Sequence, residues 1–218
     1  MNGASLASTL AAAFGRLAES GDELRELDAA VGDGDLGVTV VKGAAEVRSR
    51  LATLPPDVRP TDVVLAMADA FGNANPSTFA LLVSRGLVAG ARAIGDVDEF
   101  TTTDSVTLGR AAADAIMRRG KSAVGDKTLL DALVPSLDAA ELHSSDGAAA
   151  LESAIAAAAA GIAGVTDIAA RKGRAAWAGE RGIGIPDPGA TAYLRFLEAM
   201  RESLTDQLPT DPDEGEAQ

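Results

Sequence analysis

Three aspartates lie close together in residues 27–37, Leu-Asp-Ala-Ala-Val-Gly-Asp-Gly-Asp-Leu-Gly, with glycines between them. If Asp28, Asp33 and Asp35 converged without a partner they would repel, because two carboxylates about 4 Å apart cost about 4 kcal/mol at an effective dielectric constant of 20. Carboxylate oxygens with no histidine or cysteine nearby suit a hard cation, Mg²⁺ or Ca²⁺. The segment therefore predicts a divalent metal site.

Three other interpretations of this segment stay open on composition alone. Asp-Gly pairs are common in solvated turns. Gly32, Gly34 and Gly37 match Gly-x-Gly-x-x-Gly, but a helical segment precedes them, whereas a dinucleotide-binding loop follows a strand. An EF-hand fails because Gly37 stands at the third ligand position and no glutamate stands at the closing position, Glu46 lying two residues beyond it.

Four further segments combine glycine, proline and polar residues at expected helix ends. Residues 72–78, Gly-Asn-Ala-Asn-Pro-Ser-Thr, could offer backbone N–H groups and hydroxyls to a phosphate. Residues 125–131 open a helix, residues 171–174 form the densest basic cluster, and residues 184–191 open the last helix. Each alone is an ordinary turn, cap or surface cluster. Together with the aspartates they suit a phosphorylated ligand that arrives with a metal.

Apolar residues recur at helical spacing along nearly the whole chain, and strand signals are sparse. Helices are expected over residues 6–17, 40–51, 63–71, 79–94, 106–120, 127–142, 146–176 and 187–206. The last begins at Asp187-Pro188, an N-cap followed by proline at the first helical position. About eight helices joined by short loops predict an all-α bundle or barrel in one domain.

Composition narrows the classes of partner. The chain of 218 residues has 19 basic and 32 acidic residues and a formal charge of −13, so nucleic acid is not an expected partner. It has no cysteine, which excludes disulfides and thiolate metal sites. We expect no membrane association, because no apolar run was found to reach about 18 residues. No signal peptide is apparent, and the expected location is the cytoplasm.

The C-terminal residues differ from the rest in composition. Residues 206–218 hold five acidic residues, two prolines and no Lys or Arg. This composition is typical of a disordered acidic tail. The expected folded domain is therefore residues 1–205.

Together, the motifs resemble the nucleotide-binding L subunit of dihydroxyacetone kinases. That family shows an Ile/Val-Gly-Asp-x-Asp-His-Gly loop, a Gly-Gly-x-Ser-Gly loop, a Gly-Asp-Lys-Thr helix start and a Lys-Gly-Arg-Ala … Gly-Glu-Arg … Asp-Pro-Gly-Ala-Thr ending. The counterparts here are residues 31–37, 72–76, 125–128, 172–175, 179–181 and 187–191. The resemblance covers about residues 24–200, and its C-terminal part is the most specific.

The resemblance implies a barrel of eight antiparallel helices with the nucleotide site at one end. Asp28, Asp33 and Asp35 would hold two Mg²⁺ ions that bridge the phosphates of ATP or ADP. The residues expected around the nucleotide are Leu36, Gly37, Val38, Thr39, Ala74, Asn75, Gly125, Thr128, Arg174, Asp187, Pro188 and Gly189.

Two departures from the family pattern affect the phosphate contacts. Leu36 stands where the family has a histidine, so a polar contact is absent. Residues 72–76 read Gly-Asn-Ala-Asn-Pro instead of Gly-Gly-x-Ser-Gly, and Pro76 lacks a backbone N–H. The three aspartates are intact.

The implied function is phosphoryl transfer from Mg–ATP, or from Mg–ADP recharged by a phosphocarrier protein, to a ketose on a separate K-type subunit. The single histidine, His143, lies far in sequence from every motif, and no Ser-His-Asp or Cys-His set exists, so we expect no catalytic residue here and no sugar phosphorylation without a partner. One alternative is a regulatory, nucleotide-sensing protein that kept the fold and metal site. Another is a fatty-acid-kinase-like domain, disfavoured because those chains continue into further domains.

Overall fold

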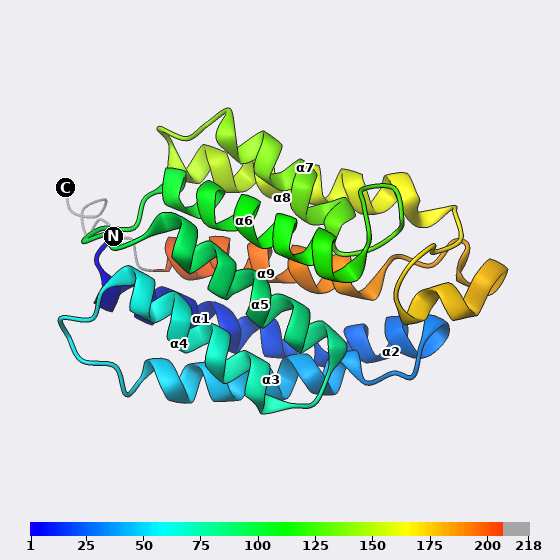
Figure 1. The fold of residues 1–218 in the computed structure, drawn as a ribbon, viewed down its shortest axis with the longest axis horizontal. Coiled ribbons are helices and arrows are strands. Elements are labelled where there is room, and N and C mark those ends of the chain that lie inside the picture. The colour runs from blue at the N-terminus through cyan, green and yellow to red at the C-terminus, as the bar shows by residue number, and fades with distance from the viewer. Residues whose placement is uncertain (207–218) are drawn as a thin grey trace, which may run out of the picture.

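Nine α-helices and one 3₁₀ segment make up the secondary structure of residues 1–206, the part of the chain that the computed structural model describes (Figure 1). They are α1 (Gly3–Glu19), α2 (Gly21–Val31), α3 (Leu36–Leu51), α4 (Pro60–Ala74), α5 (Thr78–Ile94), α6 (Thr102–Gly120), α7 (Leu130–Glu141), α8 (Gly147–Thr166), η1 (Arg174–Gly182) and α9 (Pro188–Thr205). These residues contain no strand, which confirms the expected all-α class.

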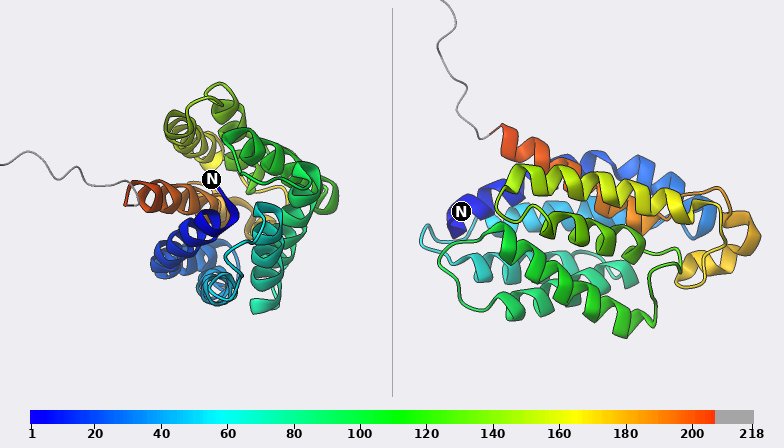
Figure 2. Two further views of the ribbon diagram at one scale, coloured as in Figure 1. Left: turned by 90° about the vertical axis from the view of Figure 1, so that its left-hand side faces the viewer. Right: turned by 90° about the horizontal axis from the view of Figure 1, so that it is seen from above.

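The helices form a closed ring (Figure 2). From α3 to α9 each α-helix packs on the next, α1 packs on α3, and α9 returns to α1. Because α2 continues α1 after a break at Ser20, nine helices give eight positions in the ring. The expected barrel is confirmed. Helices α1, α4, α6 and α8 begin at one end, called here the opposite end, and α3, α5, α7 and α9 begin at the other, called the site end (Figure 1).

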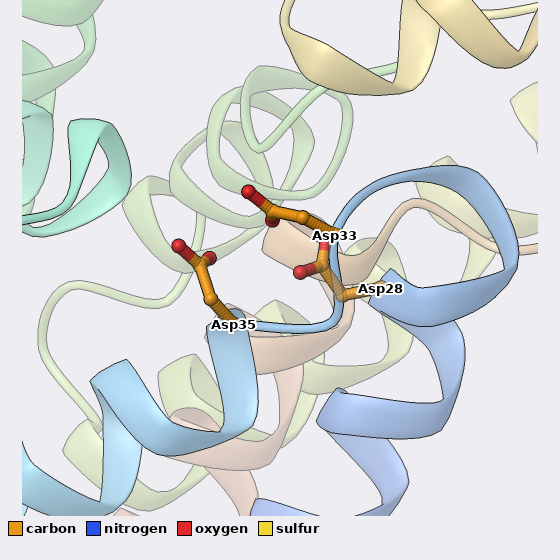
Figure 3. Close-up of side chains that lie close together, drawn as sticks. All are labelled: Asp28, Asp33 and Asp35. Carbon is orange, nitrogen blue, oxygen red and sulfur yellow. The ribbon is translucent and has the colours of Figure 1, made fainter.

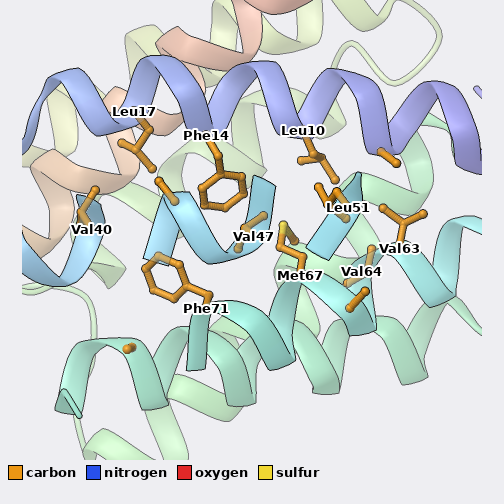
Figure 4. Close-up of a cluster of buried hydrophobic side chains, with 14 of the residues drawn as sticks. Leu10, Phe14, Leu17, Val40, Val47, Leu51, Val63, Val64, Met67 and Phe71 are labelled. Carbon is orange, nitrogen blue, oxygen red and sulfur yellow. The ribbon is translucent and has the colours of Figure 1, made fainter. Parts of the chain in front are cut away.

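Two kinds of packing hold the ring together. Large side chains of α1, α3 and α4 fill one half, where the Phe14 ring lies 6.2 Å from that of Phe71 and 5.6 Å from that of Phe196 (Figure 4). In the other half, α7, α8 and α9 meet largely through alanine. Gly161 allows this close approach, because a Cβ there would lie 1.9 Å from the Asp131 carbonyl oxygen. Small residues thus let the backbones of α7 and α8 approach closely in this half of the barrel.

Four element boundaries differ from the expectation. A separate helix, α2, precedes the acidic loop, and the helix expected over 146–176 ends at Thr166, so the basic cluster 171–174 lies in a loop. Helix α7 begins at Leu130 rather than at 127. Helix α4 runs to Ala74, which leaves only residues 75–77 between α4 and α5.

Helix α8 corrects the expectation that no apolar run is long enough to cross a membrane. This 20-residue helix holds an 18-residue stretch with a mean hydropathy of 1.7, of which 22% is buried, so it is long and apolar enough by length and composition. Alanine, glycine and isoleucine supply this hydropathy. In the barrel, α8 packs on α7 and α9 through Ala150, Ala154, Ala158 and Ile162.

The predicted acidic tail falls almost entirely outside the described residues. Asp206 is its one described member: it follows α9 as the C-cap and pairs with Arg16 of α1. Arg16 also lies 3.3 Å from Glu202, so the end of α9 is held on α1.

Candidate functional site

The three aspartates converge at the turn between α2 and α3 (Figure 3). Asp28 lies in the last turn of α2, Asp33 in the turn, and Asp35 at the N-cap of α3, and one carboxylate oxygen from each lies within 4.8 Å of the others. Gly34 has a φ of 75°, a left-handed conformation that glycine adopts without strain. Gly37 lets α3 approach α2, because a Cβ there would lie 2.1 Å from the Gly21 carbonyl oxygen.

One guanidinium balances part of this negative charge. Arg174 of η1 forms ion pairs with Asp33 and with Asp35, the latter at 3.1 Å. Burial alone would raise the pKa of Asp33, but the hydrogen bond and charge of Arg174 outweigh it and hold that pKa below its usual range. Asp28 accepts a hydrogen bond from the Leu36 amide at 3.1 Å. Three carboxylates against one cation, all oxygen donors, fit a hard divalent ion.

The turn between α4 and α5 reaches the first turn of α3. The Asn75 side-chain amide donates to the Thr39 hydroxyl at 3.0 Å, so these two predicted nucleotide residues are brought together. Helices α3 and α5 both begin without a side-chain cap. Their first N–H groups therefore have no side-chain acceptor from the cap position, the arrangement in which helix N-termini bind anions.

The structure changes what the predicted phosphate residues can offer. The Leu36 side chain is buried in the core, so only its backbone faces the aspartates. Val38 is 44% exposed on the first turn of α3. Because Ala74 ends α4, the preceding glycine-asparagine pair belongs to a helix and not to an open phosphate loop. On this side, the Asn75 side-chain amide and the first backbone N–H groups of α5 remain as candidate hydrogen-bond donors to a phosphate.

The segment before α7 is ordered by a buried carboxylate. The backbone N–H groups of Gly125 and Thr128 both donate to Asp131, which is 1% exposed. Gly125 has a φ of 95° and Lys127 a φ of 61°, so the chain turns sharply twice within three residues. This conformation directs Lys127 into the protein, where it is 3% exposed.

Lys127 was not among the predicted site residues, yet it joins three parts of the structure. Its ammonium donates to the carbonyl oxygens of Thr166, Ile168 and Gly182 at 2.7, 2.9 and 2.8 Å. Burial lowers the pKa of Lys127, while the charges of Asp187 and Asp167 oppose that shift. The only signal in the sequence was its place between two predicted residues in Gly-Asp-Lys-Thr.

These bonds fix the ends of residues 167–183, called here the 167–183 loop. The Gly184 amide also donates to the Thr166 carbonyl at 2.9 Å, so the two ends meet beside Lys127. The Arg171 amide donates to the Asp126 carbonyl at 2.9 Å. The loop that carries Arg174 to the aspartates is therefore attached to the segment before α7.

Asp187 to Gly189 form the predicted N-terminus of α9. Asp187 is the N-cap, 8% exposed, and accepts from the Ala190 amide at 2.8 Å. Burial raises its pKa to about 7, and its nearness to Asp131 contributes, while the Ala190 hydrogen bond and Lys127 oppose the shift. Gly189 lies against Phe79, with 3.3 Å between the ring and a Cβ placed there. This turn thus lies beside the start of α5.

The predicted residues accordingly fall into four groups at the site end. Asp28, Asp33, Asp35 and Arg174 form the first group, and Thr39 with Asn75 the second. Gly125 and Thr128 meet on Asp131, and the Asp187 turn interacts with Lys127 and Asp131. That all four contact one nucleotide remains a prediction.

Comparison with known proteins defines the class. Residues 30–202 match the model of the DAK2 domain, and the chain belongs to that family. The resemblance to the L subunit of dihydroxyacetone kinases is therefore confirmed.

Individual relatives are kinases or kinase subunits. The chain is 33% identical over 192 residues to L-erythrulose 1-kinase of Mycolicibacterium smegmatis, covering 86% of this chain and 33% of that one, so it spans about a third of that relative's length. It is 30% identical to the ADP-binding subunit DhaL of PEP-dependent dihydroxyacetone kinase 1 of Listeria innocua, covering 86% and 90%. Kinase chemistry is thus a property of the family.

A solved structure shares the fold. The dihydroxyacetone kinase from C. freundii, determined in complex with AMP-PNP and Mg²⁺, superposes with a TM-score of 0.69 over 92% of this chain and 33% of that one. At 24% identity this likeness shows the fold alone.

Proposed function

We propose that this chain is the nucleotide-binding subunit of a dihydroxyacetone-kinase-like phosphotransferase and binds Mg–ATP or Mg–ADP at the site end. The observation that carries the proposal is the convergence of Asp28, Asp33 and Asp35 within 4.8 Å, beside two helices that begin without a side-chain cap. Carboxylates that bind a cation and helix N-termini that bind an anion are the two halves of a site for a metal–phosphate complex.

Each group of residues has a distinct role in this proposal. The aspartates hold Mg²⁺, two ions by the resemblance, and bound Mg²⁺ neutralises phosphate charge that builds up during transfer. The backbone of Gly37, Val38 and Thr39 and the Asn75 amide contact the phosphates, with Ala74 beside them. Gly125, Thr128 and the turn from Asp187 through Pro188 to Gly189 flank the base and sugar.

Arg174 has two roles in this scheme. It pairs with Asp33 and Asp35 in the structure described here. A divalent ion on these carboxylates would compete with the guanidinium for the same oxygens, and the guanidinium would then be available to bind a phosphate oxygen.

The acceptor ketose is proposed to come from a K-type subunit. His143 is exposed between α7 and α8, at the opposite end, which agrees with its predicted surface position. The proposal is that this chain supplies the phosphoryl group and that sugar phosphorylation requires the K-type subunit, which holds the acceptor hydroxyl. We propose ATP, or ADP recharged by a phosphocarrier protein, as the source of the phosphoryl group, and the cytoplasm as the location.

Reconstitution tests this function. The purified chain, Mg–ATP and a K-type subunit would be incubated with dihydroxyacetone or erythrulose, and phosphorylated sugar would be followed by ³¹P NMR. We expect transfer only when both proteins are present. Native mass spectrometry should show bound ADP with magnesium.

The two possible failures have different meanings. Mg–nucleotide binding without transfer would favour the regulatory alternative, which the helical conformation of residues 72–74 and the missing N–H of Pro76 already support. Absence of nucleotide binding would overturn the proposed function as a whole.

A further inference from the structure

Trp177, the only tryptophan of the chain, is 86% exposed. An indole supplies a large apolar surface, and tryptophan is highly buried on average in folded proteins. Leu142 is similarly exposed at 82%, but it follows α7 at the opposite end. Trp177 differs from Leu142 because it lies at the site end, in the segment that carries Arg174.

The indole belongs to a projecting part of the site end. Trp177 lies in η1, which packs on α2 and extends beyond the ends of the barrel helices in both side views (Figures 1 and 2). Three residues earlier in the same segment, Arg174 contacts Asp33 and Asp35. Val124 and Ile183, 50% and 46% exposed, add apolar surface at this end. Trp177 thus lies in the same segment as the arginine that pairs with the aspartates.

The segment that carries Trp177 is more basic than the rest of the chain, although η1 packs on the acidic helix α2 and Arg174 is paired with Asp33 and Asp35. The 167–183 loop carries four basic and two acidic residues, in a protein whose formal charge is −13. Arg171, Lys172 and Arg181 are exposed. Tryptophan and arginine are the residues most enriched at the energetic centres of protein interfaces. The surface complementary to this loop is an apolar pocket with an acidic rim.

The loop is also held in place before any partner arrives. Lys127 binds three carbonyl oxygens at its two ends, and the Arg171 amide binds the Asp126 carbonyl. A surface fixed in advance loses less conformational entropy on binding, so more of its contact energy appears as affinity. This is the behaviour expected of a docking element rather than of a free loop.

We propose that Trp177 anchors the ketose-binding subunit, inserting its indole into an apolar pocket rimmed by acidic residues on that subunit. This inference rests on the proposed function. Phosphoryl transfer requires reacting atoms about 3–3.5 Å apart, so the protein that holds the ketose must cover the site end, where Trp177 projects. The competing account is that the indole belongs to the nucleotide pocket and stacks on the base.

The single tryptophan provides a selective probe. The chain would be labelled with 5-fluorotryptophan, which gives one ¹⁹F resonance, and titrated first with Mg–ADP and then with a K-type subunit. We expect little change with Mg–ADP and a shifted or broadened signal with the subunit. A full shift with Mg–ADP alone would overturn the proposal in favour of base stacking.

Affinity measurements complete the test. Trp177→Ala should weaken binding of the K-type subunit by at least about tenfold, the loss typical of an interface anchor, and leave Mg–ADP affinity unchanged. Trp177→Phe should recover part of the loss. Leu142→Ala, the matched control at the opposite end, should change neither affinity.

A Trp177→Ala variant that binds the subunit as tightly as the parent would contradict the inference and leave the proposed function standing. A parent protein that binds Mg–ADP but not the subunit would overturn the inference and would also favour the regulatory alternative. If Mg–ADP binding itself is absent, the proposed function fails instead.

Discussion

The two ends of the barrel treat helix N-termini in different ways. At the opposite end, α1, α6 and α8 begin at Asn2, Thr101 and Asp146, and each of these side chains accepts a hydrogen bond from its own helix. The fourth helix there, α4, has no side-chain cap, but its first residue, Pro60, has no N–H to satisfy. At the site end, α3, α5 and α7 begin without such a cap, and only α9 has one, from Asp187. Side-chain caps thus serve three of the four helices that begin at the opposite end and one of the four at the site end, where the Leu36 and Leu130 amides donate instead to Asp28 and Thr128.

Charged residues follow the same division. The opposite end uses solvent-exposed pairs such as Arg59 with Asp96, which contribute little to stability. The site end buries Lys127, Asp131 and Asp187, where each charge must be matched by hydrogen bonds or by another charge. Burying these charged side chains costs desolvation energy, but their hydrogen bonds fix the loops that surround the aspartates.

The largest expected difference between the two ends comes from replacing one aspartate at each end with alanine. Asp35→Ala removes a metal ligand, so we expect Mg–ADP binding to be lost while the unfolding free energy changes by no more than about 0.5 kcal/mol. Asp146→Ala removes the cap of α8 and should cost about 1 kcal/mol of stability without affecting Mg–ADP. Calorimetry and urea unfolding measure both. If Asp35→Ala binds Mg–ADP normally, the acidic loop is an ordinary turn.

The next effect concerns the buried ammonium. Lys127→Met keeps the apolar stem but leaves three carbonyl oxygens without their donor, and we expect a loss of about 3 kcal/mol in unfolding free energy. Hydrogen exchange should increase in the 167–183 loop, and Mg–ADP should bind more weakly. The control is Lys121→Met, an exposed lysine with a similar φ of 48°. Equal effects of the two changes would show that Lys127 does not hold the loop.

A smaller effect is expected at the guanidinium that balances the aspartates. Arg174→Gln removes the cation from Asp33 and Asp35, so Mn²⁺ or Mg²⁺ alone should bind more tightly. The pair is partly exposed, so we expect at most about 1 kcal/mol, about fivefold. Arg171→Gln, an exposed neighbour, is the control. Weaker metal binding in Arg174→Gln would mean that the arginine assists the ion instead of competing with it.

The smallest expected effect is a pH dependence of the unfolding free energy that arises from Asp187, the N-cap of α9. Burial raises the pKa of Asp187 to about 7, above its unfolded value, so its contribution to stability is present at low pH and is lost as pH rises through about 7. Asp187→Asn keeps an acceptor for the Ala190 amide and removes the charge. The variant should therefore gain stability relative to the parent between pH 5 and pH 8. A difference that is the same at both pH values would contradict the raised pKa.

The sequence predicted the features that depend on local pattern. Helical spacing of apolar residues located the ring of helices, and Asp187-Pro188 marked the start of α9 correctly. The three aspartates, separated by glycines over eight residues, could be recognised as a cluster because a short turn brings them together. These signals act within about ten residues and need no knowledge of the rest of the fold.

Features fixed by distant residues could not be predicted in this way. Alanine continues past Thr166, so the pattern predicted a longer α8, but the Thr166 and Ile168 carbonyls bind Lys127, about 40 positions earlier in the chain. The pairing of Arg174 with Asp33 spans 141 positions. Leu36 is buried in a core cluster whose other members come from several helices distant in sequence.

The central claim is that a metal–nucleotide complex binds at the site end. The dependence of ADP binding on Mg²⁺ tests this claim most directly. Unfolding would be followed with ADP at about 100 times its dissociation constant, in Mg²⁺ and in EDTA. The account predicts about 2.7 kcal/mol of added stability in Mg²⁺ and almost none in EDTA. Equal stabilisation in the two buffers, or none in either, would contradict it.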